Sequence, residues 1–319
     1  LDEIAIELTV YCNLKCEMCS VWELKEHGIE NERAKLMLRE AFELGARTFI
    51  PCGAESFMRK DFVELVEYAH NMGYTKQEIV TNGLMLTEAI MKKLKKFDTY
   101  SLQVSIDGPE HIHDRLRGEG SYAKLMQIFA DLKRHGIKYG VSSVIMRETL
   151  PFLSHIVDLA ESLGLDEISM QPFQYEISGD HKDTKRFSFL KHQETYLIHE
   201  LNELYNRAKK KNIHLFTESL FYTIPEYLIS GIRPIPPQGC HMPSRFVLID
   251  FKGNVYPCFF MRDEKMGDAN TDSLKQIWHS AVHNKMQNLG LTKNCPGCLA
   301  ACSDIASYNE SQVKTLNHA

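Results

Sequence analysis

Residues 4–8 of the chain are Ile-Ala-Ile-Glu-Leu, and residues 11–19 are Tyr-Cys-Asn-Leu-Lys-Cys-Glu-Met-Cys. The first segment is apolar and typical of a β-strand, so the second segment places three thiols in the loop directly after it. A structural zinc site needs four closed ligands, whereas three thiolates on a four-iron cluster leave one iron open to another molecule. Cys12, Cys16 and Cys19 therefore predict an open iron–sulfur site, with half of a zinc knuckle as the alternative.

The same strand opens a repeating pattern of β-strands and α-helices that covers the first two-thirds of the sequence. Helical segments such as Arg33–Leu44 and Tyr122–Arg134 carry apolar residues at spacings that give one apolar face, and Gly45 and Gly136 end them. Strands joined by helices run parallel, which predicts an α/β fold with a barrel or an open sheet. Its chemistry is then expected at the carboxyl ends of the strands. The predicted strands are Ile4–Leu8, Thr48–Ile50, Glu78–Val80, Ser101–Ser105, Tyr139–Ile145 and Glu167–Met170.

Composition and charge exclude several kinds of partner. The 319 residues carry 37 Lys and Arg against 42 Asp and Glu, a net charge of -5, so the overall field gives no reason to expect nucleic acid or an anionic membrane as a partner. No apolar run approaches the roughly 20 residues that cross a bilayer, and the first residues lack the basic and apolar parts of a secretory signal. We expect a cytoplasmic protein, in whose reducing surroundings clustered cysteines serve as metal ligands or redox groups.

The spacing of Cys12, Cys16 and Cys19 after the first strand resembles the signature of the radical S-adenosylmethionine (radical SAM) superfamily. Residues 113–118, His-Asp-Arg-Leu-Arg-Gly, resemble a second segment of that family, unless their charges only solvate the approach to a helix. The resemblance implies a partial (βα)6 TIM-like barrel and a [4Fe-4S] cluster whose free iron chelates S-adenosylmethionine. In the family the reduced cluster cleaves this cosubstrate to methionine and a 5'-deoxyadenosyl radical, which abstracts a substrate hydrogen atom. A flavodoxin- or ferredoxin-type electron donor is the implied partner.

Polar residues at the other strand ends match positions with which the family holds its cosubstrate. Pro51 to Glu55 resembles its Gly-Gly-Glu segment, in which glycine admits the ligand and the carboxylate pairs with the methionine ammonium, although Ala54 departs from the second glycine. The alternatives are a solvated turn residue at Glu55, a turn cap at Asp107 and a generic Asn-Gly turn at Asn82. The cofactor-binding residues that the resemblance implies are Gly53, Glu55, Asn82, Ser105, Asp107, Arg147 and Gln171.

A second group of cysteines lies near the end of the chain, at positions 240, 258, 295, 298 and 302. Residues 245–250 and 254–256 predict a hairpin that brings Cys240 and Cys258 together, and residues 273–279 predict a helix with Trp278 in the core. Residues 233–239, Arg-Pro-Ile-Pro-Pro-Gln-Gly, form a stiff linker before this unit. We therefore divide the chain into a barrel at residues 1–210, a linker region at 211–239 and a small α+β cluster-binding domain at 240–319.

This layout resembles the twitch unit, the shortened form of the SPASM domain found at the carboxyl end of many radical SAM enzymes. The resemblance implies one auxiliary [4Fe-4S] cluster, because five cysteines are too few for the two clusters of a full SPASM unit. The preferred ligands are Cys240, Cys258, Cys295 and Cys298, with Cys302 as a substitute or a free thiol. A four-cysteine zinc site is the alternative, since Cys-Pro-Gly-Cys also fits a zinc turn.

The sequence leaves the net reaction open. A closed auxiliary cluster fits an electron acceptor better than a substrate chelator, which favours net oxidation by dehydrogenation or cross-link formation. The substrate is a small molecule or a peptide, in natural-product or ribosomal-peptide biosynthesis. The first alternative is a radical epimerase in which Cys52 or Cys302 returns the hydrogen atom, although Cys52 is otherwise interpreted as a small buried hydrophobe. A second alternative, of another class, is a non-catalytic metal-binding scaffold, which predicts two closed metal sites and no cosubstrate cleavage.

Overall fold

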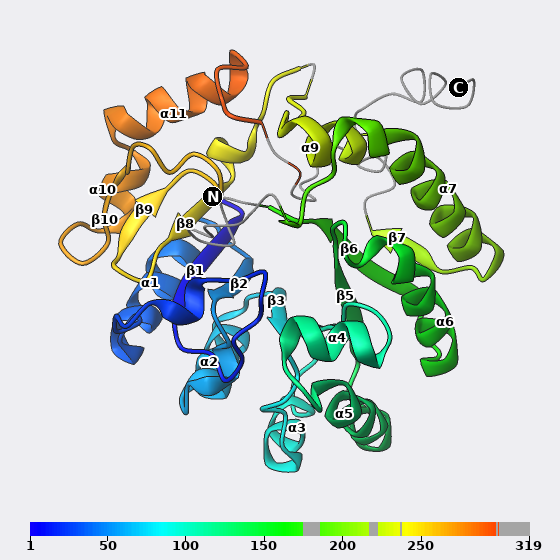
Figure 1. Cartoon of the computed structure of the whole chain (residues 1–319). Helices are drawn as coiled ribbons and strands as arrows, with labels where there is room; N and C mark the ends of the chain where they lie inside the picture. Colours follow the sequence, from blue (N-terminus) through cyan, green and yellow to red (C-terminus); the bar gives the residue numbers. More distant parts are fainter. Residues whose placement is uncertain (175–185, 217–222, 237, 298, 300–319) are drawn as a thin grey trace.

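One curved sheet is the framework of the molecule (Figure 1). The computed structural model describes residues 1–174, 186–216, 223–236, 238–297 and 299. Its strands follow the order β10-β9-β8-β1-β2-β3-β4-β5-β6-β7. Strands β1 to β7 run parallel, each paired with the next, and β8 is parallel to β1 on its other side. Within the described ranges β10 and β7 are the two edges, so the sheet forms an open, partial TIM-like barrel, as predicted.

The predicted strands are all present, with small differences at their ends. The hairpin is also confirmed, because β9 pairs antiparallel with β8. Strand β7 lies inside the predicted linker region and is additional to the six strands predicted for the barrel. The strands are β1 Glu3–Thr9, β2 Thr48–Gly53, β3 Lys76–Thr81, β4 Tyr100–Ser105, β5 Gly140–Ile145, β6 Glu167–Pro172, β7 His214–Phe216, β8 Phe246–Ile249, β9 Asn254–Tyr256 and β10 Gly267–Asp268.

Helices surround the outer face of the sheet (Figure 1). Several end where a glycine adopts a left-handed conformation that other residues rarely take, as at Gly73, Gly136 and Gly164. The α-helices are α1 Asn31–Glu43, α2 Phe62–Met72, α3 Glu88–Leu94, α4 Glu110–Arg117, α5 Ser121–His135, α6 Leu153–Leu163, α7 Glu194–Lys210, α9 Ile224–Ser230, α10 Leu274–Trp278 and α11 Ala281–Leu291. The short 3-10 helices are η1 Val21–Glu23, η2 Ser56–Met58, η3 Leu150–Phe152, η5 Lys191–Gln193 and η6 Met242–Ser244.

Strand β1 shows how alternation divides the two faces of the sheet. Ile4, Ile6 and Leu8 are fully buried in the main core, which includes residues of α1 and α2. The side chains between them project to the opposite, inner face, because successive residues of a strand alternate. On that face Ala5 packs with Phe246 and with Leu248 of β8. The inner face is therefore shared by the barrel and the C-terminal hairpin.

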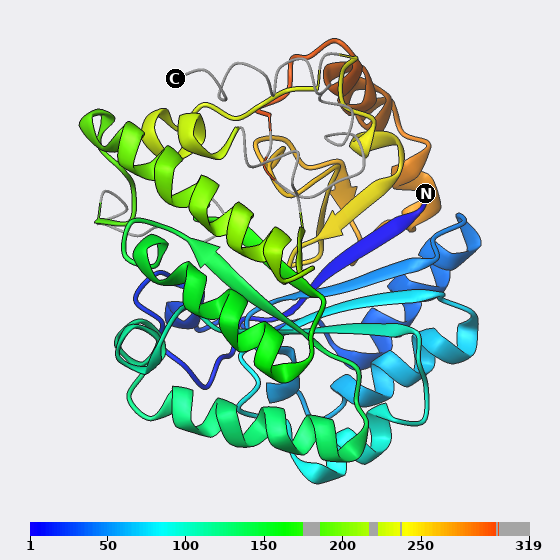
Figure 2. The same cartoon turned by 90° about the vertical axis from the view of Figure 1, so that its right-hand side faces the viewer.

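The hairpin continues the sheet of the barrel. Strands β1 and β8 lie side by side (Figure 2), and the backbone N–H groups of Asp2 and Glu3 donate to the Arg245 carbonyl at 2.7 and 3.0 Å. The division of the chain at residues 210 and 240 stays a prediction. Trp278 is partly buried against the core, as predicted. None of the described helices has the length and apolar character needed to cross a membrane.

Candidate active site

The loop with the first three cysteines crosses the carboxyl ends of the strands. We call residues 10–28, between β1 and α1, the cluster loop. Its Cys16 and Met18 are buried against Leu116 of α4 and against Met146 and Phe173, which directly follow β5 and β6. Because the loop begins at β1 and reaches β5 and β6, it brings the ends of distant strands around the thiols.

Hydrogen-bond donors and a cation face the thiols of the cluster loop. The sulfur of Cys12 accepts from the Leu14 N–H at 3.4 Å and from Asn82 Nδ2 at 3.8 Å. Burial raises the pKa of all three thiols, while the Arg117 guanidinium lowers the pKa of Cys16 and of Cys19. Iron binds the thiolate, so these donors and this cation favour the form that a cluster requires. The residues present fit an open three-thiolate iron–sulfur site.

Glu55 is a buried carboxylate of this site, with 3% of its surface exposed. It accepts hydrogen bonds from Thr81 Oγ1 at 2.8 Å, from the Asn82 N–H at 2.8 Å and from the Phe57 N–H at 3.2 Å. Burial raises the pKa of Glu55, and these three bonds act in the opposite direction. The interpretation of Glu55 as a solvated turn residue is therefore wrong. Its Oε2 accepts only one of the three bonds and keeps capacity for a further donor.

Gly53 lies close to the end of β1, and Asn82 connects Glu55 to the cluster loop. A side chain at Gly53 would place its Cβ 2.4 Å from the Thr9 carbonyl oxygen, and the φ angle of 104° also favours glycine. Asn82, whose backbone binds Glu55, uses its side-chain Nδ2 to donate to Asn13 Oδ1 at 2.8 Å. Asn82 is thus more than a generic turn residue, since it links the end of β3 to the loop that carries Cys12.

Asp107 is bound to a buried arginine. The carboxylate, with 0% exposure, accepts from Arg117 Nε at 2.6 Å and from the Val144 N–H at 2.9 Å. It therefore ties α4 to β5 instead of capping the turn that follows it. His113 is buried as well, its Nδ1 accepts from the Asp107 N–H at 3.3 Å, and burial lowers its pKa to about 4. The solvated-helix interpretation is wrong for His113 and Arg117.

Three further predicted residues lie at the ends of β4, β5 and β6. Ser105 Oγ is 3.4 Å from Ser142 Oγ on the neighbouring strand. Arg147 follows β5, and its backbone N–H donates to the Phe187 carbonyl at 3.0 Å. Gln171 is half-buried near the end of β6. The structure places these residues at the carboxyl ends of the strands, which the cluster loop also crosses. Their contact with a cosubstrate stays a prediction.

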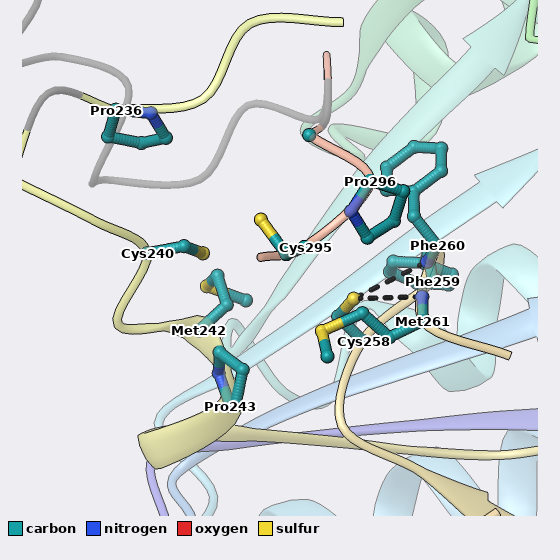
Figure 3. Close-up of a pocket in the computed structure, with 11 residues that line it drawn as sticks. Pro236, Cys240, Met242, Pro243, Cys258, Phe259, Phe260, Met261, Cys295 and Pro296 are labelled. Atoms are coloured by element: carbon teal, nitrogen blue, oxygen red, sulfur yellow. Dashed lines mark hydrogen bonds between the residues drawn. The ribbon is translucent and has the colours of Figure 1, made fainter. Parts of the chain in front are cut away.

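The second group of thiols gathers at one pocket (Figure 3). Cys240, Cys258 and Cys295 line it together with apolar side chains, and the backbone N–H groups of Phe260 and Met261 donate to the Cys258 sulfur at 3.4 and 3.3 Å. Such bonds are among the features that tune iron–sulfur clusters. The preferred ligand Cys298 and the substitute Cys302 lie outside the described residues. Three of the four preferred ligands are therefore brought together.

A single metal ion has no ready-made ligand set in the part of the chain that the structure describes. No three His, Cys, Asp or Glu side chains lie close enough there to hold one ion. The thiolates of a four-iron cluster bind different iron atoms, so they lie farther apart than the ligands of one zinc ion.

Comparison with known proteins identifies the family. Residues 6–159 match the radical SAM superfamily, and residues 240–302 match SPASM, an iron–sulfur cluster-binding domain. The PqqA peptide cyclase of Rhodopseudomonas palustris is 31% identical over 312 residues, which cover 92% of this chain and 78% of that protein. The chain belongs to the radical SAM superfamily.

One further relative matches this radical SAM protein over most of its sequence, and solved structures match its fold. The AdoMet-dependent heme synthase of Methanosarcina barkeri is 25% identical, with 93% of this chain and 90% of that protein covered. Crystal structures of Streptococcus suis SuiB bound to S-adenosylmethionine and to the precursor peptide SuiA match 93% of this chain and 70% and 71% of theirs. Their TM-scores are 0.69 and 0.70 at 18% identity. S-adenosylmethionine and iron–sulfur clusters are the cofactors of this radical SAM protein.

Cys52 lies on the inner face of this radical SAM protein, beside the same apolar cluster as Cys258. It packs into the small apolar cluster of Ala5, Phe246 and Leu248, which Cys258 also contacts. Glu7 is its register partner on β1, and Arg262 Nη2 donates to Glu7 Oε1 at 2.6 Å. Burial, with a further contribution from the charge of Glu7, raises the pKa of Cys52 well above its usual value. The sequence analysis named Cys52 but missed Glu7 and Arg262, which no motif marks.

Proposed function

We propose that this radical SAM protein catalyses the net oxidation of its substrate, by dehydrogenation or cross-link formation, with one auxiliary [4Fe-4S] cluster as the electron acceptor. The observation that carries the proposal is that Cys240, Cys258 and Cys295 line one pocket. With Cys298 or Cys302 as a fourth ligand, the pocket would supply only protein thiolates, which leaves no iron for a substrate to bind. Cys258 also packs against the inner face of the sheet, so the electron acceptor would lie beside that face.

The chain's own residues would hold the cosubstrate over the strand ends. When bound, S-adenosylmethionine and its cluster supply the 5'-deoxyadenosyl radical that abstracts a substrate hydrogen atom. Glu55, fixed by three donors, has capacity on Oε2 for the methionine ammonium. Asp107 acts indirectly, because its carboxylate is bound to Arg117 and orients that guanidinium. The remaining residues proposed to contact the cosubstrate are Gly53, Asn82, Ser105, Arg147 and Gln171.

A peptide is the proposed substrate, and a small molecule is the alternative. The name of one relative specifies a peptide cyclase, and SuiB is described with a bound precursor peptide. The inner face supports a polar substrate, since half-buried Ser101, Gln103, Ser169 and Gln171 alternate with buried apolar residues along β4 and β6. Hydroxyl and amide groups of this kind bind backbone amides or sugar hydroxyls.

Radical epimerisation with Cys52 as hydrogen-atom donor is the second candidate function. The favouring observation is the raised pKa of the Cys52 thiol, because a hydrogen-atom donor must keep its S–H. Cys52 also lies on the inner face, where it neighbours Glu7. Cys302, the other donor considered, lies outside the described residues.

An anaerobic assay in deuterated water separates the two reactions. The reconstituted protein is incubated with S-adenosylmethionine, dithionite and a panel of precursor peptides and amino sugars, and products are analysed by mass spectrometry. Oxidation predicts the loss of two hydrogen atoms without deuterium uptake, and epimerisation predicts an isomer that has gained one deuterium. In an epimerase Cys52→Ala abolishes the isomer and spares 5'-deoxyadenosine formation. Persistent isomer formation in that variant excludes Cys52 as the donor.

The same assay tests the remaining proposals. Loss of activity with dithionite replaced by buffer, and its return with a reduced flavodoxin or ferredoxin, would support the proposed electron donor. We also propose a cytoplasmic location, which is supported by the seven described cysteines, since none of them forms a disulfide bond. A non-catalytic scaffold predicts that no 5'-deoxyadenosine forms under any of these conditions.

A further inference from the structure

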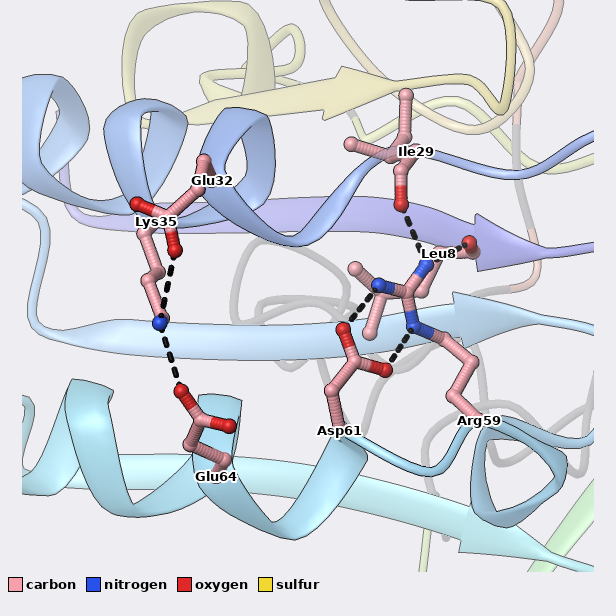
Figure 4. Close-up of polar contacts among 7 residues, drawn as sticks. All are labelled: Leu8, Ile29, Glu32, Lys35, Arg59, Asp61 and Glu64. Atoms are coloured by element: carbon pink, nitrogen blue, oxygen red, sulfur yellow. Dashed lines mark hydrogen bonds and ion pairs between the residues drawn. The ribbon is translucent and has the colours of Figure 1, made fainter.

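Arg59 contacts both ends of the cluster loop (Figure 4). Its Nη1 donates to the Leu8 carbonyl of β1 at 2.8 Å and also to the carbonyl of Ile29, which follows the loop. Asp61 holds the same guanidinium through Nε at 3.1 Å and Nη2 at 2.7 Å. With only 13% of the Arg59 side chain and 25% of Asp61 exposed, this is a partly buried, charge-assisted contact.

The two loop ends meet at an irregularity of β1. The register between β1 and β2 shifts between Glu7 and Thr9, and the Leu8 carbonyl there accepts the Ile29 N–H at 3.2 Å. Gly28 makes this approach possible, because a Cβ at that position would lie 2.1 Å from the Leu8 oxygen. Arg59 thus adds a second hydrogen bond at the Leu8 carbonyl and also binds the Ile29 carbonyl.

Further contacts hold the cluster loop between its two ends, among them the Glu55 N–H to the Tyr11 carbonyl at 3.1 Å and Arg186 Nη2 to Glu17 Oε2 at 2.5 Å. Within it the regular structure is the short η1, and the bonds that hold it elsewhere include the Glu17 N–H to the Leu116 carbonyl at 2.9 Å and Asn82 Nδ2 to Asn13 Oδ1 at 2.8 Å. A loop without fixed ends samples many conformations, and ordering it costs conformational entropy. Holding both ends in place reduces this cost and restricts where the loop residues can lie.

We propose that Arg59, oriented by Asp61, is a positioning residue that fixes both ends of the cluster loop and thereby holds Cys12, Cys16 and Cys19 in place for the radical SAM cluster. The guanidinium suits this task, since its planar fork binds the Asp61 carboxylate on one side and carbonyl oxygens on the other. The contact lies at the base of the loop and does not involve the auxiliary pocket. The role holds whichever net reaction follows, and its test needs no substrate.

Iron retention and proteolysis of Arg59→Met test this role. The reconstituted wild type is expected to hold about eight irons, from two four-iron clusters, and Arg59→Met about four after repeated anaerobic desalting, with the auxiliary cluster's spectroscopic signal kept. Trypsin cleavage at Lys15 and Lys25 should accelerate about tenfold. The reason is that the variant lacks the hydrogen bonds from the charged guanidinium to the Leu8 and Ile29 carbonyls, so the loop opens more often. Arg59→Lys, which keeps one cationic donor but not the fork, should retain an intermediate amount of iron.

Lys35→Met is the matched control. Lys35 pairs at 2.7 Å with Glu64, which is 58% exposed (Figure 4). The loss of this ion pair should leave both clusters and the cleavage rate unchanged. If Arg59→Met does not fold, Asp61→Asn weakens the fork and should show the same selective loss to a smaller extent. Wild-type iron and cleavage rates in the folded variants, or equal loss of both clusters, would overturn the proposal.

Discussion

Replacing Glu55 with Gln exchanges one buried carboxylate oxygen for an amide NH2. Oε1 accepts from Thr81 Oγ1 at 2.8 Å and from the Phe57 N–H at 3.2 Å, and Oε2 accepts from the Asn82 N–H at 2.8 Å. The Gln carbonyl can serve the first two donors, which turns its NH2 toward the Asn82 N–H, so that a donor meets a donor. A hydrogen bond to a charged group contributes about 1.5–3 kcal/mol, and we expect the free energy of unfolding to fall by that amount.

Urea unfolding of the anaerobically reconstituted protein, followed by tryptophan fluorescence, measures this change. Glu64→Gln is the matched control, because Glu64 is 58% exposed and its pairing with Lys35 should contribute less than about 1 kcal/mol. Thr81→Val, which removes one neutral donor, should cost about 1 kcal/mol. Equal losses for Glu55→Gln and Glu64→Gln would refute the reasoning, since they would mean that the Glu55 carboxylate is not committed to buried donors.

The remaining predictions concern α4 and the end of the cluster loop. Asp107→Ala should lower the free energy of unfolding by about 3–5 kcal/mol, because it leaves the buried Arg117 charge uncompensated. Combining it with Arg117→Met should recover part of this loss. A double variant that is no more stable than the single variant would contradict this explanation. Burial lowers the pKa of His113 from 6.5 to about 4, so between these two pH values the unfolded state binds more protons than the folded state. The free energy of unfolding therefore falls as the pH drops through this window, by about 1 kcal/mol from pH 7 to 5.5. Urea titrations across that range should show the slope in the wild type and a flatter dependence in His113→Asn. Gly28→Ala forces a Cβ to 2.1 Å from a backbone oxygen and should cost about 1–3 kcal/mol by the same assay, and an unchanged urea midpoint would contradict the close approach at this position.

Much of the barrel could be predicted because its strands are short apolar runs between amphipathic helices. Strand β7, His214–Phe216, could not, since three residues give too little alternation and the strand exists through its pairing with β6. The β8–β9 hairpin was predicted from its turn, but its pairing with β1 joins segments more than 200 residues apart and leaves no local signal.

The grouping of the thiols was predictable because cysteine spacing in one loop carries its own signal, and their role as ligands stays a prediction. The charged residues that form buried ion pairs around these thiols could not be predicted, because a charged residue in a sequence usually indicates solvent exposure. Arg117 and Arg59 are only 11% and 13% exposed because each meets a carboxylate in the fold. The contact of Arg262 with Glu7 spans 255 positions, so no spacing rule could find it.

Iron and sulfide content per chain is the most direct test of the two-cluster assignment. The protein is purified without oxygen and reconstituted, and the wild type is compared with the variant in which Cys12, Cys16 and Cys19 are all replaced by Ala. We predict about eight irons in the wild type and about four in the variant, because we assign one four-iron cluster to the first three thiols and the other to the pocket lined by Cys240, Cys258 and Cys295. Zinc in the second site, or no loss of iron in the variant, would contradict this division of the cysteines.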